Sequence, residues 1–212
     1  KIIEEGPWLS EEVREELGAK VVAGAEAVGY KGLATFEFLR DADGEFYFLE
    51  VNPRVQVEHT VTEMIAGVDL VSLGIRVAAG ESLPLTQSEV SISGHAIQTR
   101  INAENPFTLE PSPGRIWECH WPGGPGVRVD THAHTGYDMP PSFDSLLAKV
   151  IVWAPTRSEA IAKMDSALKE TLIIGVDTLI PLHRAILNET DFRNREITIS
   201  YLDEHPGLLD GA

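Results

Sequence analysis

The sequence is poor in cysteine, in positive charge and in long apolar runs, and each shortage excludes a class of protein. Its one cysteine, Cys119, cannot form an internal disulfide, and no array of cysteine and histidine has the spacing of a zinc site. No apolar stretch approaches the ~20 residues of a membrane-spanning helix, and residues 1–5 do not resemble a signal peptide. The composition therefore predicts a cytoplasmic protein.

Charge excludes two further classes of partner. Lysine and arginine together number 17 against 33 aspartate and glutamate residues, so the net charge is −16 at pH 7. The positive charges are scattered singly, and no basic patch offsets repulsion from phosphate backbones or acidic lipid headgroups. We therefore expect neither a nucleic acid nor a membrane as a partner. What remains is a globular composition, with 43% hydrophobic and 24% charged residues in a chain of 212.

The first part of the chain predicts helices around a β-hairpin. Ser10 is a suitable N-cap, and an apolar residue recurs at every fourth position after it. Two aromatic-rich runs flank an Asp-Gly pair, which is a strong hairpin signal. Thr60 and Glu63 form the pattern of a capping box that would open one helix. The expected elements are a strand at 1–5, a helix over about 10–28, strands at 34–40 and 45–51, and a helix from Thr60 to about residue 79.

The second part predicts a mostly antiparallel sheet with packed helices. The polar segment 81–89 has no clear period and is interpreted as a linker, which divides the chain into residues 1–85 and 86–212. Thr156 and Glu159 form a second capping box. The expected elements are strands near 92–101, 115–121, 127–132 and 147–153, a helix ending near residue 172, a short helix near 180–188 and a tail at 197–202. The predicted fold class is therefore α+β.

The hairpin brings two carboxylates together. If Asp43 and Gly44 are the central turn residues, Glu37 lies directly opposite Glu50. A four-residue loop over 41–44 would make the two glutamates diagonal neighbours, still on one face. Like charges at such positions destabilise a sheet, so a shared proton, a cation or a nearby arginine should offset the repulsion.

Two interpretations of this face compete. In the simpler one, Glu37 and Glu50 belong to the solvated face of an ordinary hairpin, which composition alone favours. In the other, the amide oxygen of Asn52 joins the two carboxylates in a site for Mg²⁺ or Mn²⁺, which prefer hard oxygen ligands. The second is favoured by the residues that follow, because Asn, Gln and Pro53 are poor choices for strand stability. The alternating polar face would continue through Asn52, Arg54, Gln56 and Glu58.

Nearly the whole chain resembles one enzyme family. The run from Arg54 to His59, Arg-Val-Gln-Val-Glu-His, is the most specific of several motifs that resemble biotin carboxylase. The resemblance implies the C-terminal half of an ATP-grasp domain followed by the biotin carboxylase C-terminal domain. The family's glycine-rich nucleotide loop and ATP-contacting lysines are expected upstream of Lys1, so we expect a partial chain that is inactive alone. The matching runs are Phe36–Phe38, Phe48–His59, Val61–Leu70, Gly94–Glu104, Pro111–Gly114 and Gly136–Ser145.

The resemblance implies an ATP-dependent carbon–nitrogen ligase that carboxylates biotin through carboxyphosphate. Glu37 and Glu50 would contact ATP through Mg²⁺ or Mn²⁺, with Asn52 as a third metal ligand. Biotin would be a substrate carried elsewhere, because Lys163 lies in a predicted helix and lacks the flanking residues of a biotin-attachment site. The implied partners are a biotin carboxyl carrier domain, a carboxyltransferase component and a second copy of the chain.

The resemblance also implies roles in bicarbonate and biotin chemistry. Arg54, Gln56 and the backbone N–H of Val57 would bind bicarbonate, and Glu58 would be its general base. Arg100 would stabilise the oxyanion that develops on the ureido group of biotin. On a straight strand Arg54 and Glu58 would be about 13 Å apart. Both therefore reach one small anion only if the backbone curls after Gln56.

Alternatives to this assignment remain. Strand alternation places Ala96, Gln98 and Arg100 on one face, and without the resemblance Arg100 would be interpreted as a surface residue paired with an acid such as Glu104. A ligase with another nitrogen acceptor, similar to carbamoyl-phosphate synthetase, is a second candidate function. A non-catalytic interaction module is a third.

Overall fold

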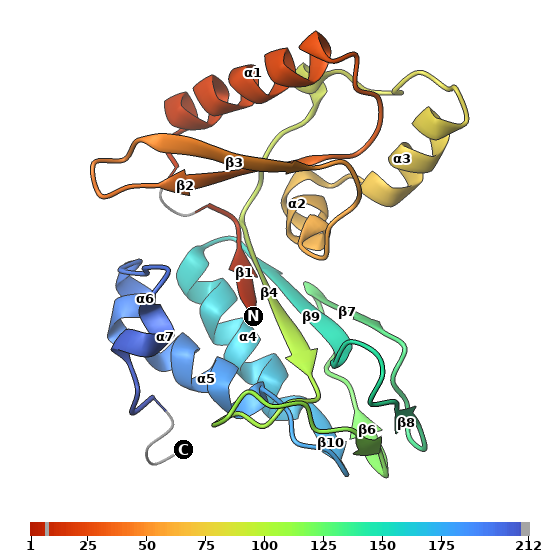
Figure 1. Cartoon of the computed structure of the whole chain (residues 1–212), viewed down its shortest axis with the longest axis vertical. Helices are drawn as coiled ribbons and strands as arrows, with labels where there is room; N and C mark the ends of the chain where they lie inside the picture. The colour runs from red at the N-terminus through yellow and green to blue at the C-terminus, as the bar shows by residue number, and fades with distance from the viewer. Residues whose placement is uncertain (7–8, 209–212) are drawn as a thin grey trace. The chain divides into compact units, whose positions relative to one another are not determined.

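The computed structural model describes residues 1–6 and 9–208, which form two compact units (Figure 1). The hairpin unit comprises residues 8–92, and the sheet unit joins residues 1–7 to residues 93–212. All strand pairs in the described residues are antiparallel, and both units carry helices, so the predicted α+β class is confirmed. Within the same residues, no helix is both long and apolar enough to cross a bilayer.

The hairpin unit is built on one β-hairpin with α1 along it (Figure 1). Ser10 caps α1 as predicted, because its side chain accepts a hydrogen bond of 3.3 Å from the Val13 N–H. Gly24 of this helix faces the hairpin, and a Cβ there would make an ordinary van der Waals contact of 3.6 Å with the Phe36 ring. Its elements are α1 (Glu11–Ala27), β2 (Thr35–Arg40), β3 (Phe46–Asn52), α2 (His59–Ala66), α3 (Leu70–Ala78) and the 3₁₀ turn η1 (Gln87–Glu89).

The hairpin has the predicted pairing but a different turn. Glu37 lies directly opposite Glu50, as expected. Asp41, however, donates its N–H to the Glu45 carbonyl at 3.0 Å, so three residues and not two form the loop. The register then shifts by one residue beside Glu37, and the extra residue is Leu49. A β-bulge therefore restores the pairing that a two-residue turn would have produced directly.

The predicted single helix after the hairpin is wrong. It is divided into α2 and α3 at Gly67, which has a left-handed φ of 67° that glycine adopts without strain. Thr60 lies inside α2 and does not cap it. Glu63 instead spans the break, because its Oε1 accepts the Leu70 N–H at 2.8 Å. Asp69 then caps α3, which explains why the chain restarts a helix there.

The sheet unit contains a four-stranded sheet in the order β1-β4-β9-β7. The strand at the start of the chain is confirmed, but it pairs with β4, about a hundred residues away in sequence. Strands β8 and β10 and helix α6 were not predicted. The elements are β1 (Ile2–Glu4), β4 (His95–Asn102), β5 (Gly114–Arg115), β6 (Glu118–His120), β7 (Val127–Thr131), β8 (Asp138–Met139), β9 (Leu146–Ala154), α4 (Arg157–Glu170), β10 (Leu172–Ile174), α5 (Ile180–Asn188), α6 (Thr190–Asn194) and α7 (Tyr201–Glu204).

A buried charge cluster fastens β1 to the sheet unit. Arg157 donates to both carboxylate oxygens of Glu4, at 2.8 and 3.0 Å. The two ring nitrogens of His95 lie 3.0 Å from Glu4 and 3.3 Å from Glu5. Burial alone would raise the pKa of Glu4, but the hydrogen bonds from His95 and Arg157 outweigh it and the pKa is lowered. The cluster thus holds β1 in register with β4.

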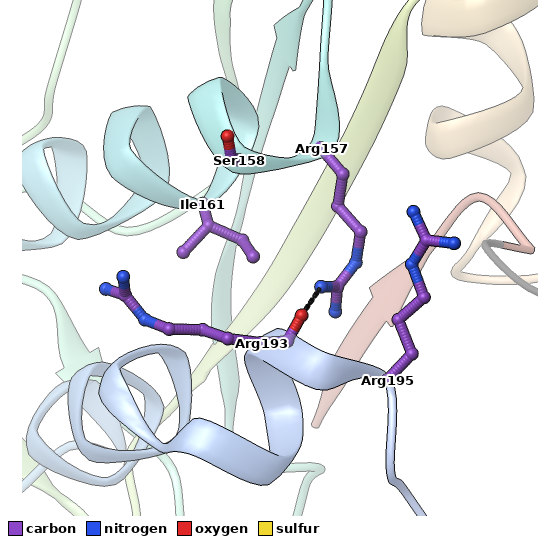
Figure 2. A pocket seen from close by; sticks show the side chains of 5 residues that line it. All are labelled: Arg157, Ser158, Ile161, Arg193 and Arg195. Carbon is purple, nitrogen blue, oxygen red and sulfur yellow. Dashed lines mark hydrogen bonds between the residues drawn. The ribbon is translucent and has the colours of Figure 1, made fainter.

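A pocket of about 200 Å³ lies at the start of α4 (Figure 2). Arg157 lines this pocket and donates hydrogen bonds to the carbonyls of Phe192 and Arg193, both at 2.8 Å. The guanidinium groups of Arg193 and Arg195 point in different directions and do not converge (Figure 2). These bonds join α4 to α6, so the Arg157 side chain serves packing. The lining residues are Arg157, Ser158, Ile161, Arg193 and Arg195.

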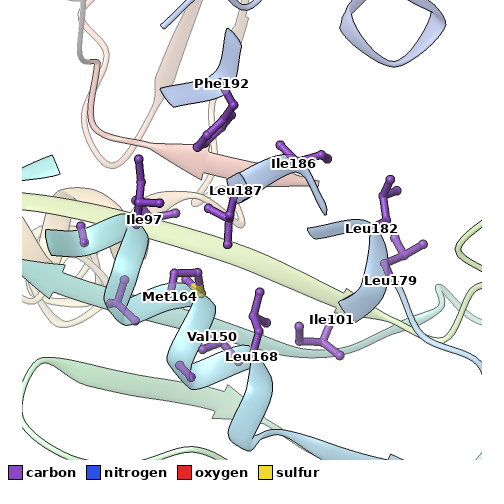
Figure 3. Packing of buried hydrophobic residues seen from close by; sticks show 14 of the residues in the cluster. Ile97, Ile101, Val150, Met164, Leu168, Leu179, Leu182, Ile186, Leu187 and Phe192 are labelled. Carbon is purple, nitrogen blue, oxygen red and sulfur yellow. The ribbon is translucent and has the colours of Figure 1, made fainter. Parts of the chain in front are cut away.

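Helices α4 and α5 cover one face of the sheet and bury the main core (Figure 3). The predicted capping box of α4 is confirmed, since Thr156 and Glu159 exchange hydrogen bonds. Ile97 and Ile101 of β4 face this core. Because side chains alternate along a strand, Arg100 lies on the opposite face. The labelled core residues are Ile97, Ile101, Val150, Met164, Leu168, Leu179, Leu182, Ile186, Leu187 and Phe192.

Candidate active site

The two paired glutamates of the hairpin share one face and one amide. The Nδ2 of Asn52 donates to Glu37 at 2.8 Å and to Glu50 at 3.0 Å. The Nε2 of Gln56 donates to the same oxygen of Glu37 at 3.0 Å. Glu37, Asn52 and Gln56 are half-buried, and Glu50 is exposed. The amide groups therefore partly offset the repulsion between the carboxylates and leave the face open on the Glu50 side.

This arrangement fits a divalent cation with hard oxygen ligands. The carboxylates are close enough for one amide nitrogen to bridge them, and rotation of the Asn52 amide would exchange that nitrogen for an oxygen. Two carboxylates and an amide oxygen suit Mg²⁺ or Mn²⁺ and leave ligand positions for phosphate and water. In residues 1–6 and 9–208, no group of three or more His, Cys, Asp or Glu side chains is arranged to hold a metal. These residues therefore fit a cation whose remaining ligands come from phosphate and water, and not a cation bound by protein side chains alone.

The chain leaves the strand direction immediately after the hairpin. The strand β3 ends at Asn52, so the polar alternation predicted beyond it is not a strand face. Arg54 donates its backbone N–H to the Asn52 carbonyl at 2.9 Å, and the His59 ring lies 2.6 Å from the Gln56 carbonyl. Arg54 also donates from its guanidinium to the Asn52 side chain at 3.2 Å. The curl therefore links the arginine to the carboxylate face.

Val57 and Glu58 lie in the turn that leads into α2. Glu58 is the N-cap residue, and its side chain makes no capping hydrogen bond, so its half-buried carboxylate is not used to hold the helix. Both residues precede the first turn of α2, where the helix dipole favours an anion, and the His59 and Val61 N–H groups there donate to the Gln56 and Glu58 carbonyls at 3.3 and 3.1 Å. The sequence placed the helix start at Thr60 and thus missed this feature.

Arg100 lies near the end of β4, between β1 and β9. Its backbone N–H donates to the Lys1 carbonyl at 3.0 Å, and its half-buried side chain has an Nε with no hydrogen-bond partner in the described residues. The alternative pairing with Glu104 is not observed, because Glu104 binds Lys1 Nζ at 2.6 Å and the Ser145 hydroxyl. Burial tends to raise the pKa of Glu104, but Lys1 and Ser145 lower it on balance.

A histidine that the sequence patterns did not single out contacts the backbone of Arg100. The Nε2 of His183, on α5, lies 2.9 Å from the Arg100 carbonyl, and His183 is fully buried at 0% exposure. Burial lowers the pKa of His183 to about 4, against a weaker opposing effect of this hydrogen bond. The ring is therefore neutral at neutral pH. Its apolar helix gave no local signal of this contact.

Stability of the sheet unit is expected to fall as the pH decreases from 6.5 to 4. An unfolded chain binds a proton on His183 near 6.5, whereas the folded chain does so only at about 4, so protonation favours unfolding in that window. The contribution of neutral His183 to the free energy of unfolding is complete above pH 6.5 and amounts to roughly 3 kcal/mol. Urea unfolding at pH 7 and pH 5 should show roughly 2 kcal/mol of this loss, and His183→Gln should remove this part of the pH dependence. An unchanged pH dependence in the variant would contradict the assignment.

Two family models match successive parts of the chain. Residues 1–86 match the ATP binding domain of the carbamoyl-phosphate synthase L chain. Residues 98–204, just over half of the chain, match the biotin carboxylase C-terminal domain. The chain belongs to the biotin carboxylase C-terminal domain family. The resemblance drawn from the sequence motifs is thereby confirmed.

Individual biotin carboxylase relatives agree. The chain is 47% identical over 210 residues to the biotin carboxylase of Haemophilus influenzae, covering 98% of the chain and 47% of the relative. It is 49% identical over 208 residues to the chloroplastic biotin carboxylase of Arabidopsis thaliana, covering 97% of the chain and 39% of the relative. A similar solved structure is the biotin carboxylase domain dimer of Hydrogenobacter thermophilus 2-oxoglutarate carboxylase, in complex with MgADP, ADP and bicarbonate. It has a TM-score of 0.97 and 45% sequence identity to this chain, and the match covers 100% of this chain and 47% of that one. The chain thus spans less than half the length of these relatives.

Proposed function

We propose that the chain is the C-terminal portion of a biotin carboxylase, with ATP-grasp residues at 1–85 and the C-terminal domain at 86–212. The enzyme uses ATP and bicarbonate to form carboxyphosphate, from which the N1′ atom of biotin is carboxylated. The observation that carries the proposal is the pair Glu37 and Glu50, bridged by Asn52 next to the curl that contains Arg54 and Glu58.

Glu37, Glu50 and Asn52 would hold the Mg²⁺ or Mn²⁺ that accompanies ATP. The bound metal would neutralise phosphate charge during phosphoryl transfer. The contribution of the protein is to keep both carboxylates on one face. The bulge at Leu49 and the hydrogen bond from Gln56 to Glu37 serve that purpose.

The curl binds and activates bicarbonate. Arg54 offers two parallel N–H donors to a planar carbonate, and Gln56 and the backbone N–H of Val57 complete the grip. Glu58 accepts the proton of bicarbonate. The freed oxygen then attacks the γ-phosphorus of ATP, the bond to the bridging oxygen of ADP breaks, and carboxyphosphate and ADP result.

Arg100 acts on biotin. Carboxyphosphate breaks down to CO₂ and phosphate, the phosphate accepts the N1′ proton, and negative charge develops on the ureido oxygen before N1′ attacks CO₂. A guanidinium remains charged throughout the reaction, so Arg100 stabilises this oxyanion without being titrated.

Related ligase chemistry is the second candidate. The match of residues 1–86 to a carbamoyl-phosphate synthase domain supports an ATP-grasp ligase with either acceptor. The match of residues 98–204 and the identity to biotin carboxylases along 98% of the chain favour biotin. No comparable observation favours a non-catalytic interaction module.

We further propose a cytoplasmic homodimer that works with a biotin carboxyl carrier domain and a carboxyltransferase. Support for these partners comes from a complete multifunctional pyruvate carboxylase of Rhizobium etli, to which the chain is 38% identical with a TM-score of 0.96, covering 100% of the chain and 20% of that one. The related 2-oxoglutarate carboxylase domain is a dimer. The compartment differs among relatives, since the Arabidopsis protein is chloroplastic.

Transfer of labelled bicarbonate tests the function. The full-length protein that contains this chain is supplied with MgATP, ¹⁴C-bicarbonate and free biotin. We expect acid-labile label that co-migrates with carboxybiotin and ADP release that rises with biotin. Label in carbamoyl phosphate when ammonia is present, with no response to biotin, would instead assign the chain to the second candidate.

A further inference from the structure

The end of β4 that carries Arg100 is held by two different elements in succession. Along most of its length β4 is bordered by β1, which reaches Arg100 through the bond to the Lys1 carbonyl. Beyond that point α5 and the residue before it border the same strand. The Leu179 N–H donates to the Asn102 carbonyl at 3.3 Å, and His183 contacts the Arg100 carbonyl at 2.9 Å.

The opposite border of β4 is irregular at this place. Arg100 pairs with Lys149 of β9 and Ile101 with Ala148, but Asn102 pairs with Leu146, so the register shifts between Ile101 and Asn102. A bulge interrupts the ladder and lets the strand bend. The contacts from Leu179 and His183 therefore restrain the backbone of β4 at the point where its pairing with β9 is interrupted.

The protonation state of His183 follows from its partner. A carbonyl oxygen only accepts hydrogen bonds, so Nε2 carries the proton and donates it. The other ring nitrogen, Nδ1, is buried and has no partner in the described residues. A buried polar atom without a partner costs stability, and an apolar side chain of similar volume would avoid that cost. The donor bond to Arg100 is the one feature that such a side chain would lose.

We propose that His183 is a positioning residue for Arg100, holding its carbonyl so that the guanidinium is presented in one place. The proposal rests on the proposed role of Arg100 in biotin carboxylation. The Arg100 side chain is attached to the backbone that carries this carbonyl, so a shift of the carbonyl displaces the guanidinium as well. Displacements of about 1 Å in a reacting group are large enough to cost up to 10²-fold in rate.

Three substitutions separate positioning from packing. In His183→Gln the side-chain amide nitrogen takes the place of Nε2 and still donates, whereas in His183→Asn the shorter amide cannot reach, and His183→Leu keeps the volume without a donor. The full-length protein is assayed for biotin carboxylation and for bicarbonate-dependent ATP hydrolysis without biotin. We expect roughly 10- to 100-fold lower kcat for biotin carboxylation in the Asn and Leu variants, near wild-type kcat in the Gln variant, and an unchanged KM for MgATP.

A double variant decides whether the effect passes through Arg100. If it does, His183→Asn lowers the rate no further in an Arg100→Ala background, because the group it positions is gone. Additive losses, wild-type carboxylation by the Asn and Leu variants, or equal losses in both reactions would overturn the proposal. A wild-type protein that does not carboxylate biotin would overturn the proposed function instead, and the melting temperatures of the Gln and Asn variants would then show only the structural part of the contact.

Discussion

Replacing Glu58 with glutamine in the full-length protein is expected to lower bicarbonate-dependent ATP hydrolysis by roughly 10²- to 10⁴-fold. Glutamine cannot accept the proton of bicarbonate, so the nucleophile for the γ-phosphate is not formed. The KM for MgATP should change little, because Glu58 lies outside the carboxylate face that is proposed to hold the metal. The measurement is ADP release as a function of bicarbonate at saturating MgATP.

Stability should not be affected by this substitution. The Glu58 side chain makes no capping hydrogen bond to α2, so an isosteric amide leaves the start of that helix intact. Glu45→Gln is the matched control, since Glu45 is an exposed glutamate on the same hairpin. Wild-type hydrolysis by Glu58→Gln, or an equal loss in Glu45→Gln, would remove Glu58 from the role of base.

The Arg100→Ala variant should carboxylate biotin roughly 10²- to 10³-fold more slowly, the range found when one oxyanion donor is removed. Bicarbonate-dependent ATP hydrolysis without biotin should decrease much less, because that reaction precedes the step in which the ureido oxyanion forms. The two rates are measured on the same preparation with and without free biotin.

The ratio of the two losses identifies the role of Arg100. Equal losses would assign it to bicarbonate binding or to folding. Arg76→Ala is the matched control, because Arg76 is exposed and pairs at 2.7 Å only with the exposed Glu81 in the described structure. That variant should retain both activities.

Local patterns predicted the hairpin well but not its turn. A turn centred on Asp43 and Gly44 predicted Glu37 opposite Glu50, and the structure has that pair. The Asp-Gly signal suggested a two-residue turn, whereas the side chain of Asp41 accepts N–H bonds from Asp43 and Glu45, at 3.0 and 2.9 Å, and stabilises a longer loop. The bulge that compensates has no sequence signature of its own.

Such local patterns could not predict contacts between segments that are far apart in the sequence. Thr60 and Glu63 matched a capping box, yet Glu63 serves the backbone of Leu70 after a glycine break. The pairing of β1 with β4 and the contact of His183 with Arg100 join residues 83 or more positions apart. Periodicity describes which face of an element is apolar, but not which other element covers it.

The candidate site also has one part that the sequence predicted and one part that it did not. Glu37, Glu50 and Asn52 share one hairpin, so strand alternation together with the assumed turn predicted that they meet. The curl from Arg54 to Glu58 was recognised as necessary but not predicted, because the hydrogen bonds of His59 to the Gln56 carbonyl that stabilise it involve a side chain with no turn signature.

A crystal structure of the full-length protein with MgADP and bicarbonate tests the account most directly. We expect a Mg²⁺ ion bonded at about 2.1 Å to oxygens of both Glu37 and Glu50, and bicarbonate bound by Arg54, Gln56 and the Val57 N–H beside Glu58. A metal held by other residues, with the two glutamates still bridged by the Asn52 amide nitrogen, would contradict it.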